Sequence, residues 1–150
     1  MWVFIDVDLT LIDKDDNPRP HIEALFQVLK THKCNIVIWS AGGWMNRELT
    51  YAEAKVGMMS NKLGIDLKKY VHAFLSKGDP PLMTPKPSFY IDDMDGLIEF
   101  QAKEGNGTFK ILPYESSLMT NDIQLLKAAE AVSKFIEKQN SSRNGQGFGR

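Results

Sequence analysis

The chain has one cysteine, Cys34, and no zinc-type spacing of cysteine and histidine accompanies it. An internal disulfide is therefore excluded, and a lone thiol beside an apolar run is typical of a buried side chain in a reducing compartment. No apolar run approaches the roughly 18 residues that a membrane span needs, and no basic segment precedes the first apolar run. From these absences we expect a soluble, cytoplasmic protein with no membrane partner.

Basic clusters are also missing. The 18 Lys and Arg nearly balance the 19 Asp and Glu, the net charge is -1, and no basic run exceeds two residues. An extended nucleic-acid-binding surface is therefore not indicated, whereas a small or locally docked substrate is compatible with this charge. We expect a single domain over residues 1–138 and a disordered tail over 139–150, because the tail is rich in Gly, Ser, Asn and Gln.

Strand-like and helical patterns alternate along the chain, which is typical of a parallel sheet with crossover helices. We predict strands at 2–5, 35–39, 71–75, 88–91 and 108–112, and helices at 20–33, 45–63, 95–103 and from 120 or 121 onward. Four of the seven prolines fall within 78–87, which predicts an irregular connection there. The acidic run Asp13, Asp15 and Asp16 predicts a solvated turn. The predicted fold class is α/β, a three-layer sandwich with a central, mostly parallel five-stranded sheet of Rossmann-like type.

Two aspartates follow the first predicted strand in MWVFIDVDLT. Residues i and i+2 of an extended chain point the same way, so Asp6 and Asp8 can converge at the carboxyl end of the strand, with Thr10 completing the group. Polar residues also end the next three strands: Ser40, Lys77 and the pair Asp92 and Asp93. Right-handed crossovers bring the carboxyl ends of parallel strands to one edge, where open α/β sheets bind their ligands.

The residues after the second strand are small. Ser40 is followed by Ala41, Gly42 and Gly43, and the next predicted helix starts almost at once. Backbone N–H groups in such a turn can approach an anion, so we interpret Ser40, Ala41 and Gly42, together with Thr10, as phosphate-binding residues. The alternative is a strand-to-helix turn that needs glycine for its dihedral angles.

Several carboxylates around one phosphate would repel it. Two unit charges about 4 Å apart interact with roughly 4 kcal/mol at an effective dielectric near 20. The predicted site therefore requires a divalent cation, and Mg²⁺ suits an all-oxygen site that lacks a His or Cys cluster.

The ordered set FIDVDLT, IVIWS, Lys77 and FYIDD resembles the four motifs of the haloacid dehalogenase superfamily of phosphotransferases, over about residues 1–112. The resemblance implies that Asp6 is the nucleophile, which forms an aspartyl-phosphate. It implies that Asp8 is the general acid and then the general base. It also implies that Asp6, the backbone carbonyl of Asp8, and Asp93 hold Mg²⁺. Asp92 is either a further ligand or an orienting partner.

The lysine of this family has two candidates here. Lys86 lies six residues before Asp92 with a strand between them, so an extended chain would separate the two by about 20 Å. Lys77 ends the third strand at the predicted site, and the ten residues after it can extend to about 33 Å, enough to return along a strand of about 17 to 20 Å. We assign Lys77, although a bend at 85–87 would instead bring Lys86 to the site.

The cap domains that are common in this family have no room in the chain. Only 29 residues separate Thr10 from Ser40, and only 14 separate Lys77 from Asp92. The resemblance therefore implies an uncapped member. Its open site would accept a phosphorylated macromolecule, such as a protein or a polynucleotide end, or be closed by a second subunit of a homo-oligomer.

We expect a Mg²⁺-dependent phosphomonoesterase. Asp8 favours phosphoryl chemistry, since family members that cleave carbon–halogen bonds use no acid at that position. One alternative is a non-catalytic module that binds Mg²⁺ or phosphate. Another is a receiver-type phosphoacceptor domain, although receivers carry their acidic pair on the first strand and the phosphorylated aspartate on the third.

Overall fold

The computed structural model describes residues 1–80, 82–118 and 121–148. Five strands form one parallel sheet in the order β3-β2-β1-β4-β5: β1 (Trp2–Asp6), β2 (Asn35–Ser40), β3 (Val71–Ser76), β4 (Phe89–Asp92) and β5 (Gly107–Lys110). The helices in the described residues are α1 (Ile22–Thr31), α2 (Tyr51–Leu63), α3 (Asp95–Lys103), α4 (Gln124–Phe148) and the 3-10 turn η1 (Lys68–Tyr70). The predicted α/β class is confirmed, with a sheet that is wholly parallel.

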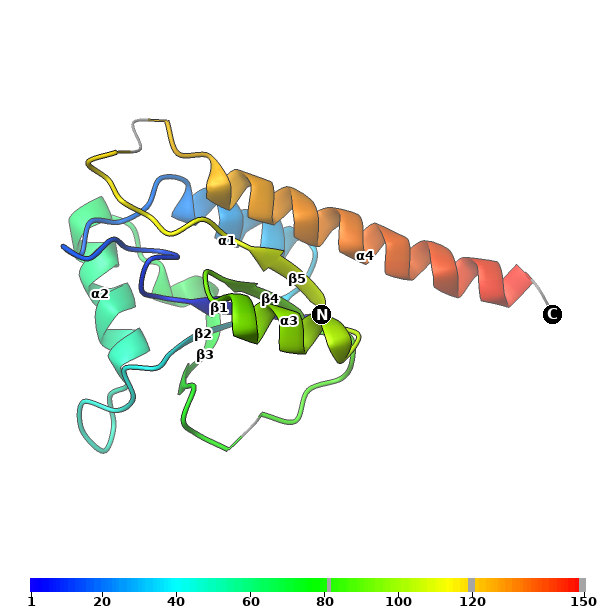
Figure 1. The fold of residues 1–150 in the computed structure, drawn as a ribbon, viewed down its shortest axis with the longest axis horizontal. Coiled ribbons are helices and arrows are strands. Elements are labelled where there is room, and N and C mark those ends of the chain that lie inside the picture. Colours follow the sequence, from blue (N-terminus) through cyan, green and yellow to red (C-terminus); the bar gives the residue numbers. More distant parts are fainter. Residues whose placement is uncertain (81, 119–120, 149–150) are drawn as a thin grey trace.

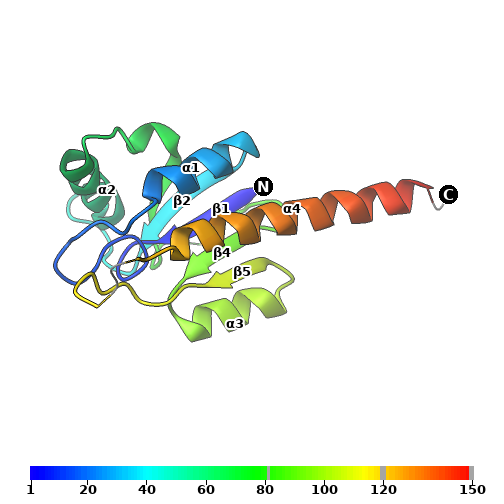
Figure 2. The same ribbon diagram turned by 90° about the horizontal axis from the view of Figure 1, so that it is seen from above.

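Helices cover both faces of the sheet, which makes a Rossmann-like sandwich of three layers. Helices α1 and α4 lie side by side on one face, and α3 lies on the other side of β4 and β5 (Figures 1 and 2). Buried side chains of α1, α2 and α4 share one core with Val3 and Ile5 of β1. Because alternate residues of a strand point to opposite faces, Phe4 instead joins Trp39 and Tyr90, with ring centroids 4.8 to 5.9 Å apart.

Helix α2 begins later than predicted. The predicted start at Met45 is wrong, because this side chain is 61% exposed and the helix begins at Tyr51. Thr50 Oγ1 accepts the N–H of Glu53 at 3.1 Å and caps the helix there. Asn46 Oδ1 accepts the N–H groups of the second and third residues after it at 2.8 and 2.9 Å, so 46–49 form a turn.

The predicted boundary at residue 138 does not coincide with the end of a helix. Helix α4 continues through Phe148, so residues 139–148 are helical where we predicted disorder, and 149–150 lie outside the described residues. The helix can continue here because each residue added to an existing helix gains one backbone hydrogen bond, and no proline interrupts the segment. Its 25 residues span about 37 Å at about 1.5 Å per residue, and its end extends beyond the sheet (Figure 2).

The connection from β3 to β4 has no helix or strand at 78–80 and 82–87, as its prolines predict.

The acidic turn after β1 is not solvated at Asp13, contrary to the prediction. This carboxylate is only 5% exposed, because it accepts the N–H groups of Asp15 and Asn17 at 2.9 and 2.8 Å and the Ser116 hydroxyl. In the part of the chain that the structure describes, no helix has both the length and the apolar character that a membrane crossing requires.

Candidate functional site

The site is built at the carboxyl ends of the strands. The loops after β1 and β5 meet at this end of the sheet, opposite the amino terminus (Figure 1). Strand β1 lies between β2 and β4, and Ile5 pairs with Ile91. The next residues of these two strands, Asp6 and Asp92, are therefore neighbours at the edge.

Three carboxylates form a cluster at this edge. Oxygens of Asp6, Asp92 and Asp93 lie within 4.8 Å of one another, and Asp6 and Asp92 are only 5% and 1% exposed. The ammonium of Lys77 lies 2.9 Å from Asp6 Oδ1 and 2.8 Å from Asp92 Oδ2. One ammonium thus contacts two of the three acidic groups. Such an all-oxygen set could hold a hard divalent cation.

Asp6 has an unusual electrostatic environment. Burial and the neighbouring Asp92 raise the pKa of Asp6 to about 8, against the opposing charge of Lys77. Its other oxygen, Oδ2, accepts the hydroxyl of the fully buried Thr10 at 3.2 Å. Burial lowers the pKa of Lys77, but Asp6 and Asp92 raise it by more, so that ammonium keeps its proton at neutral pH.

The two residues of the acidic pair after β4 differ. Both oxygens of Asp92 have partners, because Oδ2 binds Lys77 and Oδ1 accepts the N–H of Met94 at 3.0 Å. Asp93 is only half-buried. Asp92 is therefore held rigidly beside Asp6, whereas Asp93 is more accessible from solvent.

Asp8 stands apart from the cluster of three carboxylates. Its side chain is exposed, and its Oδ1 accepts the Tyr51 hydroxyl at 2.8 Å. Burial, reinforced by Asp8, raises the pKa of Tyr51 well above the usual range, so the phenol keeps its proton. Sequence reasoning missed Tyr51, because its apolar ring and helical spacing gave no sign of this contact.

The turn after β2 lies beside Lys77. Ser40 is buried, its hydroxyl accepts the Gly42 N–H at 3.1 Å, and its carbonyl accepts the Lys77 N–H at 2.9 Å. Ala41 and Gly42 are exposed. The expectation that a helix starts directly after these residues is wrong, since α2 begins at Tyr51. Any anion bound here would contact the turn itself, not a continuous helix end.

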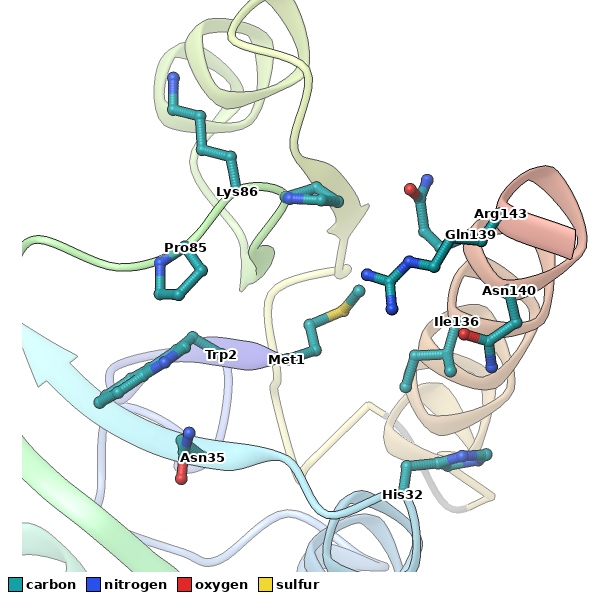
Figure 3. Close-up of a pocket in the computed structure, with 11 residues that line it drawn as sticks. Met1, Trp2, His32, Asn35, Pro85, Lys86, Ile136, Gln139, Asn140 and Arg143 are labelled. Atoms are coloured by element: carbon teal, nitrogen blue, oxygen red, sulfur yellow. The ribbon is translucent and has the colours of Figure 1, made fainter. Parts of the chain in front are cut away.

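Lys86 lies near the amino-terminal ends of the strands, opposite the aspartate cluster. Its side chain is 64% exposed, and its ammonium lies 3.8 Å from Glu104 Oε2. It lines a cavity of about 490 Å³ with Met1, Trp2 and side chains of α4 such as Ile136 (Figure 3). The structure therefore places Lys77, and not Lys86, against the aspartates.

Sequence reasoning also missed a buried ion pair that anchors the loop carrying Asp8 and Thr10. Arg19 is 1% exposed and lies 3.0 Å from Asp122. Its guanidinium also donates to three backbone carbonyls, at 3.3, 3.2 and 2.7 Å: those of Leu9, Thr10 and Leu112. The loop after β1 is thus bonded to the segment between β5 and α4. A buried arginine needs such partners, but no local sequence pattern predicts which residues they are.

Comparison with known proteins adds no family to these observations. No protein-family model matches the chain, and no curated protein matches it in sequence. The fold and the aspartate cluster therefore carry the argument for function, and the family resemblance stays a prediction.

Proposed function

We propose that this protein is a Mg²⁺-dependent phosphomonoesterase that forms an aspartyl-phosphate on Asp6, as an uncapped member of the haloacid dehalogenase superfamily would. One observation carries the proposal. The buried carboxylate of Asp6 lies within 4.8 Å of two further carboxylates and accepts a hydrogen bond from Lys77 at 2.9 Å. An oriented carboxylate beside a cation site, at the ligand-binding edge of the sheet, suits phosphoryl transfer.

The residues present fit a magnesium ion. Asp6 and Asp93 would hold it, with the backbone carbonyl of Asp8, and Asp92 would orient Lys77 through its 2.8 Å contact. When bound, Mg²⁺ would offset the negative charge of the carboxylates and polarise a phosphoryl oxygen. The donor set contains no nitrogen or sulfur, which favours Mg²⁺ over zinc.

The first half of the proposed reaction transfers the phosphoryl group. A carboxylate oxygen of Asp6 attacks phosphorus while the bond from phosphorus to the leaving oxygen breaks. Asp8 gives its proton to that oxygen. Lys77 and Thr10 hold the Asp6 carboxylate through hydrogen bonds of 2.9 and 3.2 Å. The Ser40 hydroxyl, which accepts the Gly42 N–H at 3.1 Å, would donate its own proton to a phosphate oxygen.

The second half regenerates the enzyme. Asp8, now ionised, takes a proton from water as that water attacks phosphorus. The bond between phosphorus and Asp6 breaks, inorganic phosphate leaves, and Asp8 is again protonated.

The substrate is proposed to be a phosphate on a larger molecule, such as a protein or a polynucleotide end. Asp8 is exposed, so a phosphate held at the end of a bulky molecule could reach it. The half-exposed ring of Trp44 adds an apolar surface on the loop after β2, where its indole N–H donates to Asp79 at 3.0 Å.

The sheet order favours this proposal over a receiver-type phosphoacceptor domain. The observed order is 3-2-1-4-5, whereas receiver domains have the doubly wound order 2-1-3-4-5. A non-catalytic binding module has the same geometry as the enzyme, so turnover must distinguish these two.

The deciding experiment measures phosphate release from p-nitrophenyl phosphate, a phosphopeptide and a 3'-phosphorylated oligonucleotide, with Mg²⁺ and with EDTA. We expect Mg²⁺-dependent release that falls at least 100-fold in Asp6→Asn. Asp66→Asn, which makes the same change at an exposed aspartate, is the control and should match wild type. Mg²⁺ binding without release from any substrate would contradict the enzyme and support the binding module.

A further inference from the structure

We infer that Tyr51 positions Asp8 to protonate a leaving alkoxide, and that the substrates of this site are therefore phosphate monoesters of aliphatic alcohols. The inference rests on the proposed function and adds a positioning residue and a substrate class to it. It starts from the 2.8 Å hydrogen bond between the Tyr51 hydroxyl and Asp8 Oδ1.

That contact leaves one oxygen of Asp8 available. Among the described residues, the Tyr51 hydroxyl is the one side-chain hydrogen-bond partner that Asp8 has, and it occupies Oδ1. Asp8 Oδ2 is then free to carry a proton toward a leaving group. A carboxyl group anchored through one oxygen presents the other in a fixed direction, which an unanchored, exposed side chain does not do.

The phenol that anchors Asp8 is itself held from several sides. An added Cβ at Gly42 would lie 2.5 Å from Tyr51 Cγ, so the ring packs directly on the turn after β2. The Tyr51 N–H donates to the Gly43 carbonyl at 2.9 Å, which fixes the start of α2. The Lys55 ammonium lies 5.2 Å from the ring centroid and 2.9 Å from Asp16.

These contacts link two segments of the site. Tyr51 joins the loop after β1, which carries Asp8, to the turn after β2, which carries Ser40 and Gly42. The proton donor and the proposed phosphate-binding turn are therefore held in one relative position. Glycine at position 42 is needed because any larger residue would push the Tyr51 ring away.

The substrate class follows from the chemistry of leaving groups. An aliphatic alkoxide is a strong base and leaves phosphorus slowly unless it receives a proton, whereas p-nitrophenolate is a stable anion and leaves without one. General acid catalysis contributes about 10²- to 10⁴-fold where the proton is needed. A site that anchors its acid is adapted to the first class of substrate.

The test compares Tyr51→Phe with Tyr70→Phe on a series of phosphate monoesters. The series runs from p-nitrophenyl phosphate through phenyl phosphate to glycerol phosphate, and kcat/KM is measured with Mg²⁺ because it reports the steps through loss of the leaving group. Tyr51→Phe removes only the hydroxyl and keeps the packed ring. Tyr70→Phe is the matched control, since this phenol also contacts a carboxylate, Glu23 at 3.5 Å, just before β3 at the opposite edge.

We expect Tyr51→Phe to lower kcat/KM about tenfold or more for glycerol phosphate and less than about threefold for p-nitrophenyl phosphate. Asp8→Asn should show the same graded pattern with a larger loss, and Tyr70→Phe should match wild type throughout. An equal loss on every substrate, or none on any, would overturn the positioning role while leaving the phosphatase proposal intact. A wild-type protein inactive on this series, on a phosphopeptide and on a 3'-phosphorylated oligonucleotide would overturn both.

Discussion

The ammonium of Lys77 lies 2.9 Å from Asp6 Oδ1, although 71 residues separate them in the sequence. The same ammonium lies 2.8 Å from Asp92, so one cation joins the carboxyl ends of the neighbouring strands β1 and β4. All three side chains are largely buried. Removing the cation would leave two carboxylates together with little solvent, which is costly.

We therefore predict that Lys77→Met destabilises the metal-free protein, by about 3 kcal/mol as for other broken buried pairs. We also predict that Mg²⁺ raises the Tm of this variant more than that of wild type, because a bound cation replaces the missing charge. Thermal melts over a Mg²⁺ titration measure both effects. Lys103→Met, at an exposed lysine of α3, is the control. Equal Mg²⁺ shifts in Lys77→Met and wild type would contradict this prediction.

Lys86→Ala should leave the proposed activity within about twofold of wild type. Its ammonium lies at the amino-terminal edge of the sheet beside Glu104, and its side chain is 64% exposed. Surface ion pairs of this kind contribute about 0 to 1 kcal/mol, so stability should also change little. Steady-state kinetics with Mg²⁺ measure the activity. A 100-fold loss of kcat would contradict the prediction and assign Lys86 to the functional site.

Arg19→Leu should lower the free energy of unfolding by about 3 to 5 kcal/mol, because Asp122 would remain buried without its partner. The double variant, which also carries Asp122→Leu, should lose less than the sum of the two single variants. Arg19→Lys keeps the charge but not the planar fork and should fall between Arg19→Leu and wild type. Urea unfolding of the four variants gives the coupling free energy, and additive losses would show that the pair is not coupled.

Asp13→Asn should change how stability depends on pH. Burial raises the pKa of Asp13, but hydrogen bonds from Ser116, Asn17 and the backbone lower it by more, so the folded-state pKa lies below its ordinary value of 3.8. A lowered folded-state pKa stabilises the protein above the unfolded-state value, and this contribution is lost as the pH falls through the folded-state value.

The wild-type advantage over Asp13→Asn, about 1 to 3 kcal/mol for lost hydrogen bonds, should therefore stay constant from pH 7 to about pH 5 and shrink below about pH 4. Urea unfolding at several pH values measures it, and the exposed Asp66→Asn is the control. An advantage that grows as the pH falls would have the wrong sign.

Much of the fold was predictable because its signals are local. Each strand was located to within about two residues, since a buried strand is a short apolar run and its polar end residue marks the edge of the sheet. The start of α2 was not predicted correctly. Met45 and Leu49 have helical spacing, but Asn46 holds the backbone in a turn and Thr50 caps the helix. Side-chain hydrogen bonds to the backbone can override apolar spacing.

By itself, the sequence determined the parallel α/β fold and the edge at which Asp6, Lys77 and Asp92 meet, because right-handed crossovers and chain reach limit where strand ends can lie. Only the tertiary structure decided which groups touch. Arg19 and Asp122 are 103 residues apart, and Tyr51 and Asp8 are 43 apart. The physical reason is that a contact between two loops depends on the whole path of the chain between them, and no short-range pattern of residues encodes that path.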